Sequence, residues 1–222
     1  MSFENKKELG ISLEWKDEDY HFVHNFSLER LGMYFSKILF KDERIKNPDF
    51  LYKFYGKNEN SINSLLENYI YFSNPRNFND PFDCLANRED KIIKNDGIKQ
   101  HRDNIGICCF SYANDNPLMW GHYANSFTGF CLKFKNENIL KSENIAIKSP
   151  VYYLKNYQPD KESFNKIKRD INQFEINSEI KENTLKILTM LREYTWKYID
   201  WQYEKEFRAI SFNTNKFNNK LN

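Results

Sequence analysis

Two glutamates and an arginine near the C-terminus have the types and spacing for chemistry on one strand face. In YEKEFRAI, Glu204, Glu206 and Arg208 follow one another at intervals of two, which places them on the same side of a β-strand. Carboxylates about 7 Å apart repel each other and shift each other's pKa. A solvated strand with cross-strand ion pairs would explain this pattern. The functional interpretation is a carboxylate that orients a sugar hydroxyl and stabilises an oxocarbenium-like transition state, as glycosidic bond cleavage requires.

A loop rich in Asn, Asp and Pro is the second polar block. In FSNPRNFNDPFD, Asp80 precedes a proline, and Asn79 and Asp83 flank it among phenylalanines. The proline favours extended backbone at Asp80. Asn and Asp readily bond neighbouring backbone, so ordinary loop structure is one interpretation. The other is a clamp that binds a polar small molecule against aromatic walls.

A third block, MWGHYA, places a histidine among aromatic residues. His122 adjoins Tyr123 and follows Trp120 by two positions. It is either a structural histidine at a core boundary, or a site residue that binds a ribose or phosphate or transfers a proton. The four cysteines have no zinc-type spacing with it, so no metal ligand is predicted. The chain has no GxGxxG, P-loop or GxSxG motif, which leaves Rossmann, P-loop and serine hydrolase functions without support.

Short strands and helices must position these blocks. Apolar runs bounded by turn residues predict strands at 50–56, 69–73, 105–112, 130–134, 151–154 and 203–212. Helices are predicted where apolar residues recur at helical spacing or a capping residue precedes them: 26–40, from Asn60 or Ser61 to Leu66, from Pro117 after Asp115 or Asn116, and 160–199 with a break near Asn177 and Ser178. The fold class is α+β, with a central mixed or mostly antiparallel sheet and flanking helices.

Composition limits the remaining possibilities. The 222 residues carry a net charge of +2, and 19 Phe and 14 Tyr predict a core rich in rings. No basic cluster favours duplex nucleic acid. The charged N-terminus and the lack of a long apolar run predict neither export nor a membrane span, so we expect reduced cysteines in a cytoplasmic protein. We expect an N-terminal extension with one helix at 1–47, one α+β domain at 48–212, and a frayed tail at 213–222.

Four segments in order resemble one known family. LYKFY, IYFSNPRNFNDPFDC, ICCFSYANDNPLMWGHYANSFTGFCLKF and WQYEKEFRAI closely resemble the bacterial family of domain of unknown function 2971. The resemblance spans about residues 51–210. Its most specific pieces are FNDPFD, LMWGHYA followed by GFCLKF, and the pattern of Trp201, Glu204, Glu206 and Arg208.

The order of blocks also looks like the ADP-ribosyltransferase superfamily. That resemblance implies a split sheet that holds NAD, with a Glu on the nicotinamide ribose. The three strand positions that it assigns are Tyr52 and Lys53, then Phe72 and Ser73, then Glu204 or Glu206. The first position departs from the usual His or Arg. From the polar blocks we also expect contacts to the cofactor at Asn79, Asp80, Asp83, Trp120, His122, Tyr123 and Arg208.

The resemblance implies an NAD-dependent ADP-ribosyltransferase-like effector that modifies a protein or nucleic acid, as a toxin or phage-defence component would. Two alternatives stay open. One is a non-catalytic module of a defence system that binds a nucleotide or a partner protein. The other is a metal-dependent nuclease that uses Asp80, Asp83, Glu204 and Glu206 around a divalent cation.

Overall fold

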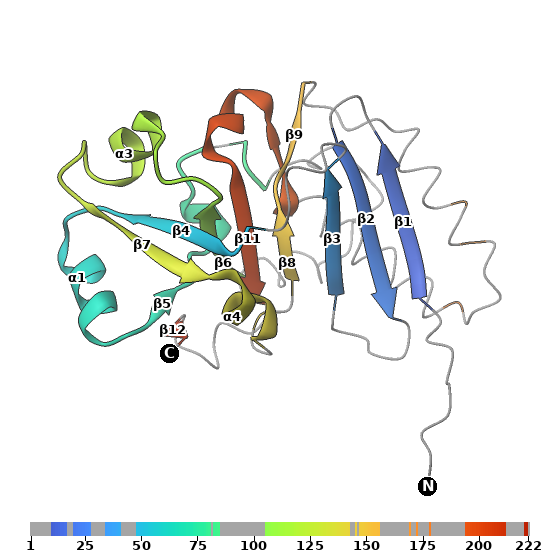
Figure 1. Cartoon of the computed structure of the whole chain (residues 1–222), viewed down its shortest axis with the longest axis horizontal. Coiled ribbons are helices and arrows are strands. Elements are labelled where there is room, and N and C mark those ends of the chain that lie inside the picture. Colours follow the sequence, from blue (N-terminus) through green and yellow to red (C-terminus); the bar gives the residue numbers. More distant parts are fainter. Residues whose placement is uncertain are drawn as a thin grey trace, which may run out of the picture.

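A five-stranded antiparallel sheet forms the centre of the computed structural model (Figure 1). Its strand order is β7-β4-β6-β11-β8, with β4 at Phe50–Tyr55, β6 at Gly106–Ser111, β7 at Phe130–Lys135, β8 at Ile147–Pro150 and β11 at Glu206–Ser211. The predicted mixed α and β composition and the mostly antiparallel sheet are confirmed. The structure describes residues 10–16, 20–27, 34–40, 48–80, 82–84, 105–142, 145, 147–155, 169, 172, 178, 194–211 and 220–221.

The two faces of this sheet differ because side chains alternate along each strand. Cys109 lies opposite Arg208 and Ser111 opposite Glu206 in the antiparallel pair of β6 and β11, so these four side chains share one face. We call it the polar face. The other face is apolar, and its core cluster consists of Leu51, Phe72, Cys108, Phe110, Ile139, Ile145, Phe207 and Ala209.

Short helices surround the sheet (Figure 1). They are α1 at Glu59–Leu66, α3 at Pro117–Tyr123, α4 at Asn136–Lys141, and the 3-10 helices η1 at Pro75–Asn77 and η3 at Ile199–Glu204. Of the two predicted capping residues, the Asn116 side chain caps α3 and accepts from the Leu118 amide at 2.9 Å. The cap of α1 is Asn58, which precedes both predicted caps, Asn60 and Ser61. None of the described helices has both the length and the apolar character to cross a membrane.

The central sheet opens between β4 and β6. These strands share one register pair, Tyr52 with Ser111. Two residues before Ser111, the Cys109 carbonyl accepts a 3.5 Å hydrogen bond from the side chain of Lys53. Ile107 exchanges two backbone hydrogen bonds with Ser73, at 2.8 and 2.9 Å. Along β6, Ser111 therefore pairs with β4 and Ile107 pairs with Ser73. We call the place between these two pairings, at Cys109, the split in the sheet.

The helix predicted at 26–40 is wrong where the structure describes those residues. Strands β1 (Gly10–Lys16), β2 (Tyr20–Ser27) and β3 (Tyr34–Phe40) form an antiparallel sheet, and β3 lies alongside β8 (Figure 1). Seven residues of β3 pair in register with β2. The spacing of apolar residues within one segment cannot predict such pairing, because the partner strand is another segment of the chain.

Several predicted strand and helix ends also move. Strand β5 is limited to Ile70–Tyr71 and pairs with β12 (Lys220–Leu221) outside the central sheet. Trp196–Tyr198 is strand β10, parallel to β9 (Tyr152–Leu154), where a helix was predicted. Of the predicted helix break, Asn177 lies outside the described residues and Ser178 is helical.

The last strand begins later than its sequence pattern predicts. Glu204 is the last residue of η3, and Lys205 adopts a left-handed backbone conformation with φ 46°. Glu206 is then the first residue of β11. The alternation predicted for residues 203–210 therefore holds for Glu206 and Arg208 and fails for Glu204, because the backbone turns at Lys205.

Gly129, the residue before β7, lies against backbone atoms, and a methyl group there should be costly. A Cβ at Gly129 would lie 2.1 Å from the Tyr55 carbonyl oxygen, which is a backbone atom. We expect Gly129→Ala to lower the free energy of unfolding by at least roughly 1–3 kcal/mol, measured by urea denaturation. The control is Gly121→Ala in α3, where the nearest atom is 3.8 Å away and alanine favours helix. Equal stability of the two variants would contradict this account.

Candidate functional site

Arg208 lies at the centre of the polar face and has no exposed surface. Its five N–H donors all have acceptors. Two donate to the Glu206 carboxylate at 2.7 and 3.1 Å, two to the Asp83 carboxylate at 2.6 and 2.9 Å, and one to the Tyr194 carbonyl at 2.8 Å. Such planar two-point pairing suits a guanidinium. Arg208 thereby holds the loop after η1 against β11.

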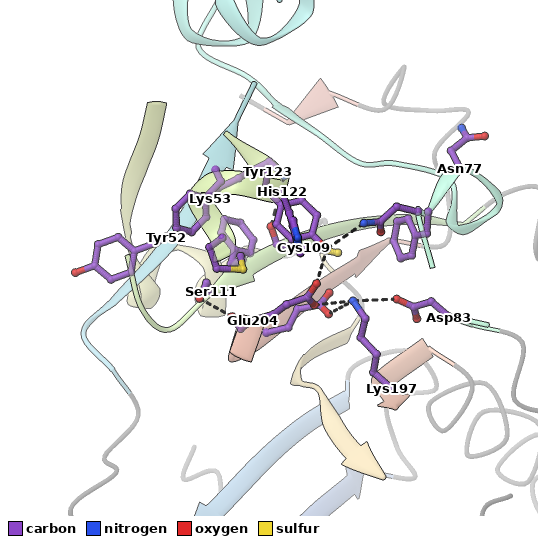
Figure 2. A pocket seen from close by; sticks show the side chains of 16 residues that line it. Tyr52, Lys53, Asn77, Asp83, Cys109, Ser111, His122, Tyr123, Lys197 and Glu204 are labelled. Atoms are coloured by element: carbon purple, nitrogen blue, oxygen red, sulfur yellow. Dashed lines mark hydrogen bonds and ion pairs between the residues drawn. The ribbon is translucent and has the colours of Figure 1, made fainter. Parts of the chain in front are cut away.

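A lysine from β10 completes the charge cluster. Lys197 Nζ lies 2.6 Å from Glu204, 3.4 Å from Glu206 and 3.5 Å from Asp83 (Figure 2). All five side chains, including Arg208, are buried. We call Asp83, Lys197, Glu204, Glu206 and Arg208 the buried charge network. With three carboxyl groups and two cations, the network is neutral only when one carboxyl group carries a proton.

Glu204 is the carboxyl group that takes this proton most readily. Burial and the neighbouring Glu206 raise the pKa of Glu204 to about 7, although Lys197 opposes the shift. The Tyr123 hydroxyl donates to Glu204 Oε1, and Lys197 donates to Oε2. Burial would also raise the pKa of Glu206, but Arg208 and Lys197 hold it below its usual range. The two glutamates therefore differ in protonation near neutral pH.

Local turns place the carboxylates beside one another. Directly before the left-handed turn at Lys205, the Glu204 carbonyl accepts a hydrogen bond from the Ser111 hydroxyl at 2.6 Å. Asp80 accepts from the Phe82 amide at 2.9 Å, and its carbonyl accepts from the Asp83 amide at 3.1 Å. These bonds shape the turn that directs Asp83 toward Arg208.

Contacts between α3 and η3 secure the opposite side. The side-chain amide of Asn116 donates to the Tyr203 carbonyl at 3.0 Å, and His122 Nδ1 lies 2.8 Å from the Tyr203 hydroxyl. The Asn79 amide reaches the Tyr123 hydroxyl at 3.2 Å. The loop, α3 and η3 thus meet over the polar face of the sheet.

A cavity of about 350 Å³ lies where these elements meet. Figure 2 shows that side chains from the strands, the loop, α3 and η3 surround it. Eight residues that the sequence predicted as site residues line this cavity: Tyr52, Lys53, Asn79, Asp83, His122, Tyr123, Glu204 and Glu206. Residues far apart in the sequence therefore converge in one cleft, which is a condition for a shared site.

The other predicted site residues lie outside the lining. Phe72 is in the apolar core, and Ser73 lines a separate cavity. Asp80 shapes its own loop, as described above. Trp120 packs edge-on against Phe54 and donates to the Asn114 carbonyl at 2.7 Å. Arg208 holds the carboxylates from beneath and is not itself in the lining.

The sequence analysis missed several lining residues. They are Phe54, Asn77, Phe78, Cys109, Phe110, Ser111, Met119 and Lys197. Lys197 matters most because it contacts all three carboxylates. It fell within a predicted helix, where its acidic neighbours at helical spacing are Glu193 and Asp200, and neither belongs to the buried charge network. The alternation of Cys109 and Ser111 along β6 was a usable signal, because every second residue of a strand shares a face.

The carboxylates do not form a metal site. Lys197 and Arg208 occupy the space between Asp83, Glu204 and Glu206, while Asp80 is engaged in its loop. Within the described ranges, no group of three or more His, Cys, Asp or Glu residues could hold a metal ion. The donor set therefore does not fit the divalent cation of the nuclease alternative.

Removing Arg208 should destabilise the protein strongly. Arg208→Met leaves Asp83 and Glu206 with one shared cation in a buried site. We expect a loss of about 3–5 kcal/mol in the free energy of unfolding, measured by urea denaturation. Arg208→Lys keeps the charge and loses the two-point pairing, so it should lose less. If Arg208→Met matched the wild-type stability, the network would not hold this face together.

The pKa of Glu204 predicts how stability depends on pH. An exposed Glu titrates at about 4.3, whereas folded Glu204 titrates at about 7. The folded state therefore binds more protons between these values, and its stability falls as pH rises through them. Glu204→Gln cannot ionise. Its free energy of unfolding should rise relative to wild type between pH 5 and pH 8; a constant difference would contradict the raised pKa.

Comparison with known proteins identifies a family and no reaction. Residues 119–209 match the model of a family described as "Protein of unknown function (DUF2971)", which confirms the predicted resemblance to this family. No curated protein and no solved structure matches the chain, so a relation to ADP-ribosyltransferases stays a prediction. The segment that matches the DUF2971 family contains β7, Lys197, Glu204, Glu206 and Arg208.

Proposed function

We propose that the cleft cleaves the glycosidic bond of NAD and transfers ADP-ribose to an acceptor. The observation that carries this proposal is the charge of the buried network. It is neutral with Glu204 protonated, and ionisation of Glu204 adds one negative charge at the cavity wall. A buried negative charge stabilises a cation at short range. The nicotinamide ring of NAD and the oxocarbenium-like ribose are both cationic.

The proposed reaction follows from this charge. The bond between ribose C1′ and the nicotinamide nitrogen breaks, and its electron pair neutralises the departing ring. An acceptor oxygen or nitrogen forms the new bond to C1′, and ionised Glu204 takes the acceptor proton. A carboxylate has about four lone-pair sites, and Tyr123 and Lys197 use two of them. Acceptor capacity therefore remains on Glu204.

Glu206 and Arg208 act as positioning residues in this proposal. Arg208 and Lys197 hold Glu206 ionised, and Glu206 in turn raises the pKa of Glu204. This separation of two neighbouring pKa values is typical of acid and base pairs in active sites. The aromatic lining, which includes Tyr52, Phe54 and Phe78, offers rings against which a planar nicotinamide can pack. The positions that the resemblance assigned to Phe72 and Ser73 have no part in this cavity.

Nicotinamide release tests the proposal. Purified protein is incubated with NAD, alone and with cell lysate as a source of acceptors, and free nicotinamide is measured by chromatography. Wild type should release nicotinamide, faster as pH rises through about 7 because Glu204 acts as the base. Glu204→Gln should be slower by roughly 100-fold or more. Glu59→Gln, at the exposed start of α1, is the control and should match wild type.

Two results would count against this function. Equal rates for wild type and Glu204→Gln would remove Glu204 from the chemistry. Thermal stabilisation by NAD without nicotinamide release under any of these conditions would instead favour the non-catalytic nucleotide-binding module, since a ligand that binds only the folded state raises its apparent stability.

A further inference from the structure

Lys53 is a partly buried cation that lacks an acidic partner. Its Nζ donates to the Cys109 carbonyl at 3.5 Å and lies 5.4 Å from the centre of the Tyr55 ring. No carboxylate of a described residue forms an ion pair with it. Lys197, across the same cleft, has three such partners. An ammonium has three donors, so Lys53 retains donors for another group.

Lys53 also lines two cavities. The cleft that contains Glu204 and a second cavity of about 520 Å³ share two lining residues, Lys53 and Phe54. The second cavity lies between β4, α1 and the segment around Ser73. Lys53 bridges β4 and β6 there, because its Nζ donates to the Cys109 carbonyl.

The two cavities differ in the charge of their lining residues. Three carboxyl groups, Asp83, Glu204 and Glu206, line the first cavity. Among the residues that line the second, Glu67 is the one acidic side chain, and amides and hydroxyls predominate: Asn58, Asn60, Ser61, Asn63, Ser64 and Ser73. A ligand matched to both has a cationic or sugar end in the first cavity, an anionic group at Lys53, and a neutral polar end in the second.

We propose that Lys53 binds a phosphate group of a nucleotide that extends through the split in the sheet from one cavity into the other. Lysine binds phosphate as a compact point charge, and a ligand phosphate would supply the anion that the described residues do not. The proposal rests on the proposed function for the identity of the cationic end, and phosphate binding itself requires no turnover. It places the base and second ribose in the cavity lined by α1.

Binding of ADP and adenosine tests this assignment. Dissociation constants for both are measured by calorimetry on wild type, Lys53→Met and Lys57→Met. Wild type should bind ADP at least tenfold more tightly than adenosine. Lys53→Met should weaken ADP binding about tenfold or more and leave adenosine binding unchanged, since a charge-assisted hydrogen bond contributes on this scale. Lys57 is exposed and lines neither cavity, so Lys57→Met should resemble wild type.

Backbone amide chemical shifts of the wild-type protein, measured by NMR, provide a second test that does not depend on a variant. Addition of ADP should shift the NMR signals of Cys109 and Ser73, which flank Lys53 at the split. The inference is overturned if Lys53→Met binds ADP as wild type does, if ADP binds no more tightly than adenosine, or if neither binds. Failure of nicotinamide release alongside the expected ADP results would contradict the proposed function and leave the phosphate site intact.

Discussion

The burial of Arg208 between two carboxylates is the constraint on which the rest of the site depends. A guanidinium without exposed surface is costly unless every donor is paired, and here Glu206, Asp83 and Tyr194 together accept from all five. Each acceptor comes from a different part of the chain. The polar face of β11 is therefore compatible with folding only if the loop after η1 and the segment before β10 close over it.

The same constraint influences the protonation of Glu204. The three carboxyl groups of the network share two cations, and Glu204 shares Lys197 with Asp83 and Glu206. The pKa of Glu204 rises because ionisation would add an uncompensated charge in a buried place. A structural ion network and a proton-exchanging group are thus built from the same side chains. The contacts of Tyr123 and Lys197 then fix where the Glu204 carboxyl group lies.

The cleft itself results from how the sheet is joined. β4 and β6 share one register pair, and Ser73 continues the edge of β6 beyond the split. The strands on the other side of β6 pair continuously through β11 and β8. Beside the short β4–β6 pairing, one partly buried lysine, Lys53, lines two cavities.

Much of the fold followed from local patterns. The apolar run of β6, the Asn116 cap with Pro117, and the alternation along β11 identified these elements correctly, because each pattern depends on neighbouring residues. The helix predicted over β3 was wrong because strand pairing is non-local. The turn at Lys205 was missed because a non-glycine residue seldom adopts positive φ.

The sequence by itself determined that polar blocks separated by over 150 residues in the chain, from Tyr52 to Arg208, contain groups suited to a common site. It also determined which residues alternate on each strand face. Only the tertiary structure decided that Lys197 joins the carboxylates, that Arg208 lies beneath the cavity, and that Phe72 and Ser73 lie elsewhere. The reason is physical: the protonation of Glu204 and the partners of each charge depend on burial and distances across the fold, which residue spacing along the chain does not encode.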